Sequence, residues 1–181
     1  MAPAISTKLT YDDYVLIPDD GRRHEIIDGE HYVNPAPNRM HQAVSINLIL
    51  ALGYHVRTNK LGTIYHAPFD VVLSRVDVVQ PDILFVSNAR EQLFTKNNLQ
   101  GAPDLAIEIL SPSTRKLDKT LKLKRYELFG VDEYWIVDAT LRSVTIYRRA
   151  GEQLERVPMS DPITSPLLPG LAVPLADVFA E

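Results

Sequence analysis

The sequence predicts a mixed α/β or α+β domain with a central β-sheet. Two stretches, residues 38–57 and residues 112–129, have the apolar spacing and flanking residues of helices. Between and after them lie short runs rich in Val, Ile, Leu and Tyr, which are typical of strands. Because helices and strands alternate irregularly along the chain, we expect a mixed domain built around a central sheet.

Length and composition predict a single domain spanning residues 1–181. No repeat or linker interrupts the 181 residues, and no apolar run approaches the ~20 residues that a membrane span needs. The formal charge of −4 argues against a generally basic nucleic-acid binder, although it leaves room for a local basic groove.

The chain contains no cysteine, which excludes disulfides, thiolate metal sites and thiol nucleophiles. Any metal would therefore be held by oxygen or imidazole ligands, which favours magnesium, manganese or calcium. The absence of cysteine also fits a cytoplasmic protein, and residues 1–10 lack the apolar segment of a secretory signal.

Capping and turn residues define the elements of the first third of the chain. Thr10 and Asp13 predict a short helix that runs to Leu16. Asp28-Gly29 predicts the turn of a hairpin over residues 24–33. The longest helical pattern follows over residues 38–57.

The rest of the chain is predicted to contain mainly strands. Residues 63–74 predict a long strand in which Pro68 marks an edge or a bend. The second helix begins near Pro112 and stops at Gly130, and Leu117, Leu121 and Leu128 are expected to pack on the sheet edge. The other expected strands are residues 78–86, 104–110, 133–138, 143–149 and 153–157, and residues 175–179 predict a last helical turn.

Glu108 is the first candidate for chemistry. It lies in a strand pattern that is apolar on both faces, so burial would raise its pKa unless a cation compensates. An alternative is a structural ion pair between Glu108 and an arginine.

Asp82 is the second candidate, because Pro81 places it at a strand start, an edge or a bulge. The alternative is a turn aspartate that caps its own backbone. Two carboxylates on successive strands, Asp82 and Glu108, instead indicate a shared cation.

The second helix carries the most basic segment of the chain. Asp118, Lys122 and Tyr126 recur every four residues and share one helix face, with Arg115 and Lys119 close to it. This pattern indicates a phosphate-facing helix whose Lys122 reaches the carboxylates. A solvated amphipathic helix is the alternative.

Glu25 and His41 are weaker candidates. Glu25 precedes two isoleucines in the predicted hairpin, and His41 lies in the first turn of the long helix. A single histidine near a helix start is more often a solvated or capping residue than a functional one.

These residues together resemble a known pattern. The order Pro81-Asp82, then Glu108 in an apolar strand, then a basic helix resembles the PD-(D/E)XK nuclease superfamily. The chain is most similar to the Uma family of restriction-endonuclease-like proteins, over about residues 10–178. The matching segments are residues 24–30, His41, residues 80–82, residues 107–114, the set Asp118, Lys122 and Tyr126, and residues 130–138.

The resemblance implies a restriction-endonuclease-like core, a central mixed sheet flanked by helices, with a catalytic magnesium (or manganese) ion. Asp82 and Glu108 would bind the metal, and Glu25 would be a third acidic group there. The lysine that the superfamily places two residues after the glutamate is Leu110 in this sequence, so Lys122 would replace it.

The remaining site residues follow from the same resemblance. His41 would carry a proton or orient Glu25. Arg115, Lys119 and Tyr126 would contact nucleic acid.

The first functional hypothesis is therefore a magnesium-dependent endonuclease that hydrolyses phosphodiester bonds of DNA. A non-catalytic nucleic-acid or protein-interaction module that retains the nuclease fold is the alternative. Hydrolysis of a small phosphorylated substrate is a third hypothesis, because a fold does not fix the substrate. Exposed sheet edges would allow a two-fold homodimer.

Overall fold

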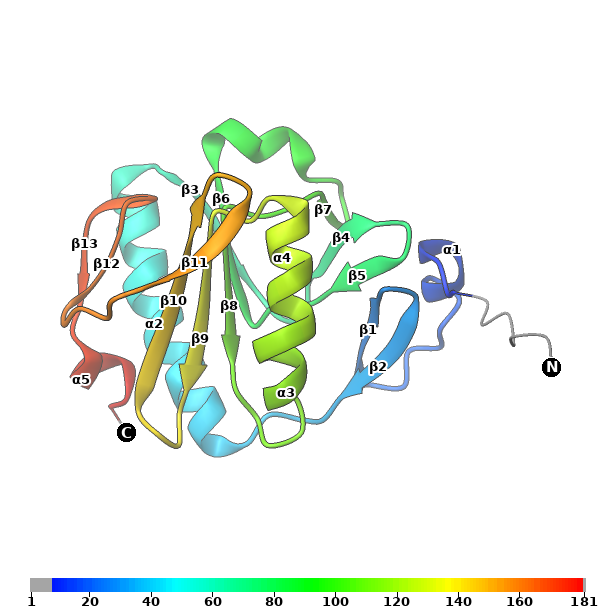
Figure 1. Cartoon of the computed structure of the whole chain (residues 1–181), viewed down its shortest axis with the longest axis horizontal. Helices are drawn as coiled ribbons and strands as arrows, with labels where there is room; N and C mark the ends of the chain where they lie inside the picture. The colour runs from blue at the N-terminus through cyan, green and yellow to red at the C-terminus, as the bar shows by residue number, and fades with distance from the viewer. Residues whose placement is uncertain (1–7, 181) are drawn as a thin grey trace.

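A six-stranded mixed sheet forms the centre of the computed structural model, which describes residues 8–180 (Figure 1). Its strands, from one edge to the other, are β11 (Gln153–Val157), β10 (Ser143–Ala150), β9 (Glu133–Asp138), β8 (Leu105–Ile109), β6 (Ile83–Ser87) and β3 (Gly62–His66). Strands β8 and β9 run parallel, while the other neighbours in this sheet are antiparallel. The mixed α+β class is therefore confirmed.

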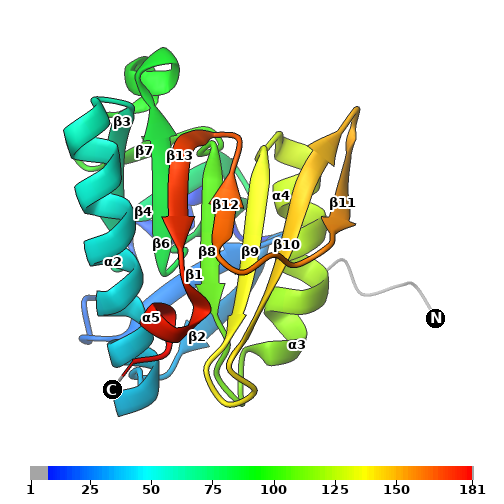
Figure 2. The same ribbon diagram turned by 90° about the vertical axis from the view of Figure 1, so that its left-hand side faces the viewer.

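Helical layers cover both faces of this sheet (Figure 2). One face packs on α2 (Arg39–Asn59), on the hairpin of β12 (Ile163–Ser165) and β13 (Leu168–Val173), and on α5 (Leu175–Val178). The other face packs on a segment made of α3 (Arg115–Leu117), the π-helical turn η2 (Asp118–Lys122) and α4 (Leu123–Phe129).

Strand alternation decides which side chains meet which layer. In β8, Leu105, Ile107 and Ile109 belong to the core beneath α2, whereas Ala106 belongs to the core beneath α4. Glu108 shares the parity of Ala106 and therefore faces the α3–α4 segment.

A second sheet lies beside the first and carries the N-terminal part of the described chain. Its strand order is β2 (Glu30–Asn34), β1 (Arg23–Ile27), β5 (Asp77–Val79), β4 (Asp70–Ser74) and β7 (Asn98–Gln100). The predicted hairpin is confirmed as β1–β2, where Asp28 and Gly29 both have positive φ, as a type I′ turn requires. Helix α1 (Tyr11–Tyr14) precedes it, and Asp13 accepts a hydrogen bond from the Thr10 backbone N–H.

Two predicted long strands are wrong, because the chain changes sheet within each of them. Residues 63–74 form β3 and β4, with Pro68 between them, and residues 78–86 form β5 and β6, with Pro81 between them. Proline has no N–H for the ladder, so pairing ends there and the chain can cross to the other sheet.

Other elements lie close to the predicted bounds. Asn38 caps α2, since its side chain accepts from the His41 backbone N–H, and Gly130 ends α4 with a φ of 87°. Leu117 and Leu121 are half-buried as expected, but Leu128 is 65% exposed, so its predicted packing on the sheet is wrong.

Three short elements are not predicted by the sequence. Strands β7 and β12 have three residues each, too few to show an alternation, and the 3₁₀ segment η1 (Asn88–Leu93) spans only six residues. Within residues 8–180 no helix is long and apolar enough to cross a membrane. The expectation that residues 1–10 are not a secretory signal falls mostly on residues 1–7, which lie outside the described residues.

Two glycines give a matched test of this packing. A Cβ on Gly62, where φ is 155°, would lie 2.1 Å from the backbone oxygen of Val86 on the paired strand β6. We expect Gly62→Ala to lower the free energy of unfolding by about 2 kcal/mol, because the backbone must shift.

The control is Gly53→Ala in α2, where a Cβ meets no atom within 4 Å. Removing glycine from a helix interior is expected to raise the free energy of unfolding by about 0.5–1 kcal/mol. Urea denaturation of both variants measures the two changes, and equal effects of the same sign would contradict this description of the β3–β6 contact.

Candidate active site

Pairing of β6 with β8 brings the two predicted carboxylates together. Ile83 is paired with Ile107, so Asp82, just before β6, lies beside the end of β8. The backbone N–H of Ile109 donates to Asp82 Oδ2 at 2.8 Å. Asp82 and Glu108 are both almost completely buried, with exposed fractions of 6% and 2%.

Lys122 reaches Glu108 from the neighbouring helical segment. Its Nζ lies 2.9 Å from Glu108 Oε1, and the Tyr126 hydroxyl donates to the same oxygen at 2.8 Å. Asp118 Oδ1 is 3.8 Å from Lys122 Nζ. The predicted helix face of Asp118, Lys122 and Tyr126 therefore exists, but it faces the protein interior.

The π-helical turn η2 begins at Asp118 and ends at Lys122, and both side chains are buried. Such a turn inserts extra backbone into a helix and is frequent at functional sites. In this protein the π-helical turn begins at Asp118 and ends at Lys122, and both of these side chains approach Glu108.

Glu25 enters the cluster from the other sheet. Its Oε1 lies 2.9 Å from Lys122 Nζ and accepts the Gln80 backbone N–H at 2.6 Å, while Oε2 accepts from Asn34 Nδ2 at 2.7 Å. Glu25 is completely buried and is absent from the cavity lining. Its contacts are those of a residue that positions Lys122, rather than the third metal-binding group that the resemblance implied.

Arg23 and His41 both contact Asp82. Arg23 Nη1 donates to Asp82 Oδ1 at 2.7 Å, and His41 Nε2 lies 3.2 Å from Oδ2. Burial opposes ionisation of Asp82, but His41, Arg23 and the Ile109 N–H together lower its pKa to about 2. His41 was expected either to carry a proton or to orient Glu25. The structure places it against Asp82, so it does not orient Glu25.

These side chains surround a cavity of about 250 Å³ between two loops. One loop precedes α2 and the other joins β8 to α3 (residues 34–38 and 111–114). The ionisable side chains that line it are Arg23, His41, Asp82, Glu108, Asp118 and Lys122.

Two carboxyl groups of the cluster have a raised pKa, and burial is the main cause. Burial raises the pKa of Glu108 to about 8, and it also raises the pKa of Asp118. Although burial disfavours an ammonium, Glu108 and Glu25 hold the pKa of Lys122 above its usual range. Lys122 therefore remains a cation, but its one charge is shared among three carboxylates.

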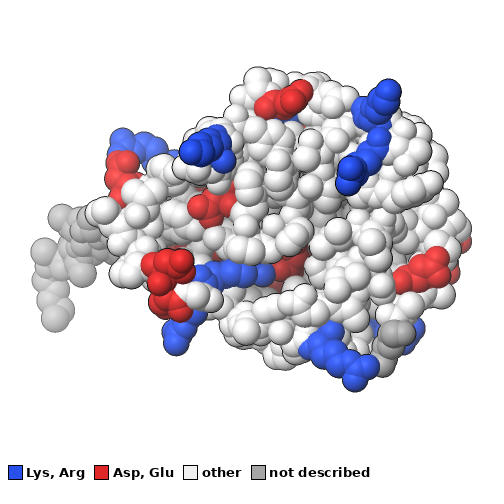
Figure 3. Space-filling model, turned by 180° about the vertical axis from the view of Figure 1, so that it is seen from behind, with Lys and Arg blue, Asp and Glu red and all other residues white. Residues whose placement is uncertain are grey.

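The residues predicted to contact nucleic acid lie in three different settings. Tyr126 is completely buried, so a contact with DNA does not fit this structure. Arg115 Nη1 pairs with Asp138 Oδ2 at 2.7 Å, and Lys119 is exposed. On the face seen in Figure 3, acidic and basic atoms lie in a hollow near the centre, while the other charged side chains are dispersed.

Sequence reasoning missed Arg23 and used Asp118 only as a marker of a helix face. Alternation along β1 places Arg23, Glu25 and Ile27 on one strand face, and this pattern could have linked Arg23 to Glu25. Asp118 lies one helical turn before Lys122, which is the spacing that could have identified it.

Comparison with known proteins is consistent with this architecture. A protein from Anabaena variabilis ATCC 29413, whose crystal structure is described as that of a "putative nuclease belonging to DUF820", superposes with a TM-score of 0.79. The two chains are 20% identical, and the match covers 94% of this chain and 97% of that one. At this identity the likeness shows a shared fold.

No curated protein matches the chain in sequence. A family model does match it over residues 11–176, namely that of Uma2, described as "Putative restriction endonuclease". Since the match spans most of the 181 residues, the chain belongs to the Uma2 family of restriction-endonuclease-like proteins.

Proposed function

We propose that the protein is a divalent-metal-dependent nuclease that hydrolyses phosphodiester bonds of DNA. The observation that carries this proposal is the cavity that Asp82, Glu108 and Lys122 share. The family description supports a nucleic-acid substrate, and the carboxylates with a neighbouring ammonium supply groups suited to hydrolysis of a phosphate ester.

The net charge of the cluster fits a cation. Four buried carboxylates belong to it, and when all four are ionised the two permanently cationic side chains Arg23 and Lys122 balance only half of their charge. The carboxylates are Glu25, Asp82, Glu108 and Asp118. A divalent ion would supply the two missing positive charges and would favour ionised Glu108.

The oxygen atoms that remain available would be the metal ligands, and within the described residues no group of three His, Asp or Glu side chains is already arranged around a metal position. Both contacts described for the Glu108 carboxylate fall on Oε1, and Glu108 lines the cavity, so Oε2 can serve as a ligand. Asp82 accepts two hydrogen bonds on Oδ2 and one on Oδ1, which leaves a lone pair on Oδ1. Asp118, which also lines the cavity, is a further oxygen donor within its walls.

Magnesium or manganese bound there would supply a water of lowered pKa and would offset charge on the phosphoryl oxygens. Lys122 contributes through its own charge. Because its ammonium stays protonated, it acts as a hydrogen-bond donor and not as a general base. From its place in the cavity wall, it would stabilise negative charge that develops on the phosphate.

The surrounding residues hold these groups in place. Glu25 and Tyr126 fix the positions of Lys122 and Glu108, and Arg23 fixes the carboxylate of Asp82. His41 contacts Asp82 and lines the cavity, so it can orient this carboxylate or carry a proton to the leaving group.

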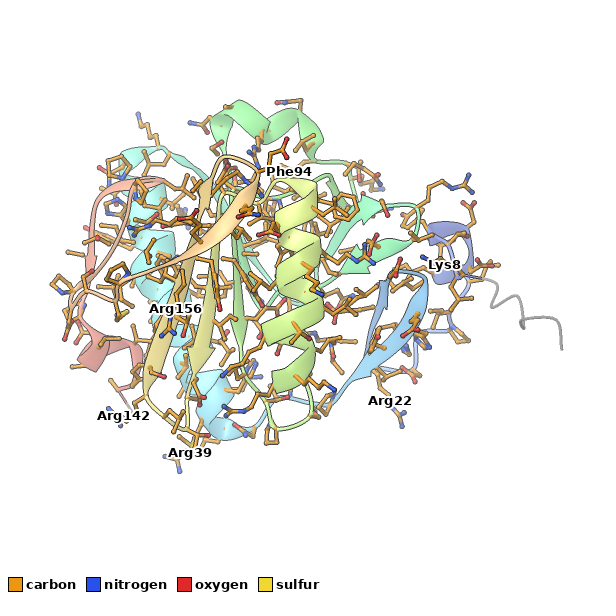
Figure 4. All side chains as sticks on the ribbon, viewed as in Figure 1. Lys8, Arg22, Arg39, Phe94, Arg142 and Arg156 are labelled. Atoms are coloured by element: carbon orange, nitrogen blue, oxygen red, sulfur yellow. The ribbon has the colours of Figure 1, made fainter. Side chains whose placement is uncertain are left out.

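Exposed arginines lie near the cavity end of the molecule, which supports a polyanionic substrate. Arg39 at the start of α2 and Arg142 after β9 both project outward at the lower end of the view in Figure 4. Arg115, in the helical segment that follows the cavity loop, is 39% exposed in its side chain. Such side chains would hold phosphates of the backbone without reading base sequence.

The first test is Glu108→Gln, which preserves side-chain volume and removes one negative charge. We expect Mn²⁺ affinity to fall at least about 10-fold and DNA cleavage to fall about 100-fold, because a metal ligand is lost. Calorimetric titration and a cleavage assay on single- and double-stranded DNA measure the two effects.

Glu133→Gln is the matched control, since Glu133 is equally buried in the neighbouring strand β9 but pairs with Arg148 away from the cavity. It should retain the metal affinity and cleavage of the wild type even where its melting temperature falls. Wild-type protein that binds no divalent ion, with or without DNA, would favour the non-catalytic module instead.

A second test uses the stability of the metal-free protein. Because the pKa of Glu108 is raised from 4.5 to about 8 on folding, the folded state holds a proton that the unfolded state releases between these values. The free energy of unfolding should therefore fall as the pH rises from 5 to 8, by at most about 1.4 kcal/mol per pH unit from this group.

Glu108→Gln has no such proton, so its stability should fall less over the same range. Urea denaturation in EDTA at several pH values measures the difference between the two proteins. Parallel pH profiles would show that Glu108 is already ionised in the folded protein without metal.

A further inference from the structure

We infer that the substrate is single-stranded DNA, held in a groove that leads from the active-site cavity along α2 and the edge strand β3. This inference rests on the proposed nuclease function and specifies its substrate. Three observations carry it: the continuity of the groove, its charge and the exposed ring of Tyr54.

The groove is continuous because neighbouring cavities share walls. A second cavity of about 540 Å³ shares Arg23, His41 and Asp82 with the active-site cavity. A third, of about 920 Å³, shares Ile49, Leu50 and His66 with the second. The groove therefore runs from Asp82 between α2 and β3 toward the end of α2.

The charge of the groove suits a polyanion. Apart from Asp82 at its inner end, no aspartate or glutamate is among the described residues that line the second and third cavities. The basic side chains that line it are Arg23, His41, Arg57 and His66, and Arg23 is paired with Asp82 at 2.7 Å. The chain as a whole has a net charge of −4, so a surface with few carboxylates differs from the average of the molecule and repels a polyanion less.

A tyrosine gives the outer part of the groove a surface on which a base can stack. Tyr54 of α2 is 76% exposed and lines the third cavity. Tyr65 of β3 is paired with Leu84 and stacks on Phe69, so its ring lies on the other face of the sheet, toward the core beneath α4. Aromatic platforms beside cations are the usual means of binding single strands without sequence preference.

Burial of the carboxylates favours a single strand over a duplex. The scissile phosphate must enter a cavity of about 250 Å³ to reach Asp82 and Glu108. Duplex DNA is stiff over about 150 base pairs and its bases are stacked inside the helix. A single strand can bend into the cavity, and an unpaired base can lie on Tyr54.

The test measures binding without catalysis. Fluorescence anisotropy in EDTA would compare a labelled oligodeoxynucleotide as a single strand, as a duplex and as RNA of the same sequence. We expect the wild type to bind the DNA single strand about ten-fold more tightly than the duplex. Tyr54→Ala and Arg57→Glu should each weaken single-strand binding about ten-fold.

Matched controls lie away from the groove. Leu128→Ala removes an exposed apolar side chain from α4, on the other face of the sheet. Arg156→Glu makes the same charge change as Arg57→Glu, but in β11, at the opposite edge of the sheet from β3 (Figure 4). Both controls should bind single-stranded DNA as the wild type does.

Tighter binding of duplex or RNA, or equal losses in the groove variants and controls, would overturn the inference. Cleavage is measured separately, so the two proposals can fail independently. Single-strand binding that depends on Tyr54 and Arg57, without any metal-dependent cleavage, would support the groove and contradict the nuclease. Cleavage of duplex DNA that is unaffected in the groove variants would support the nuclease and contradict the groove.

Discussion

The ammonium of Lys122 is the contact on which the candidate site depends, because it joins carboxylates from three parts of the fold. Glu25 belongs to β1 of the second sheet, Glu108 to β8 of the central sheet, and Asp118 to the same helical segment as Lys122. Without this cation, buried carboxylates would face one another with little compensation. The charge cluster therefore links the two sheets at the point where the cavity opens.

Lys122 places an ammonium beside Glu108 although a leucine lies two residues after this glutamate. Leu110 has the parity of Glu108 and packs into the core beneath α4. The ammonium therefore comes from the neighbouring helical segment. Here the π-helical turn places the Cα of Lys122 so that its Nζ meets Glu108 at 2.9 Å.

Much of the fold could be predicted because its signals are local. A cap such as Asn38, a turn such as Asp28-Gly29 and the apolar periodicity of α2 act within a few residues. The division of residues 63–86 between two sheets could not be predicted, because it depends on which distant strand each segment pairs with.

The candidate site was partly predictable for the same reason. Glu108 and Asp82 stand out as carboxylates beside apolar strands. Tyr126 was misplaced, because four-residue spacing defines a helix face but not whether that face meets solvent or the sheet. Arg23 was missed, since only the packing of the second sheet beside the central sheet brings β1 against Asp82.

Burial of the charged cluster has a consequence for any substrate. Carboxylates that are at most 6% exposed interact strongly with one another and with a cation, because little water screens them. The same burial means that a phosphate must leave water and enter the cavity before it meets these groups. Under the proposed function, selection at this step would act on the width and flexibility of the polymer rather than on base sequence. No base-reading element would then be needed to discriminate among nucleic acids, and the groove between α2 and β3 would be the path of a flexible strand to the cavity.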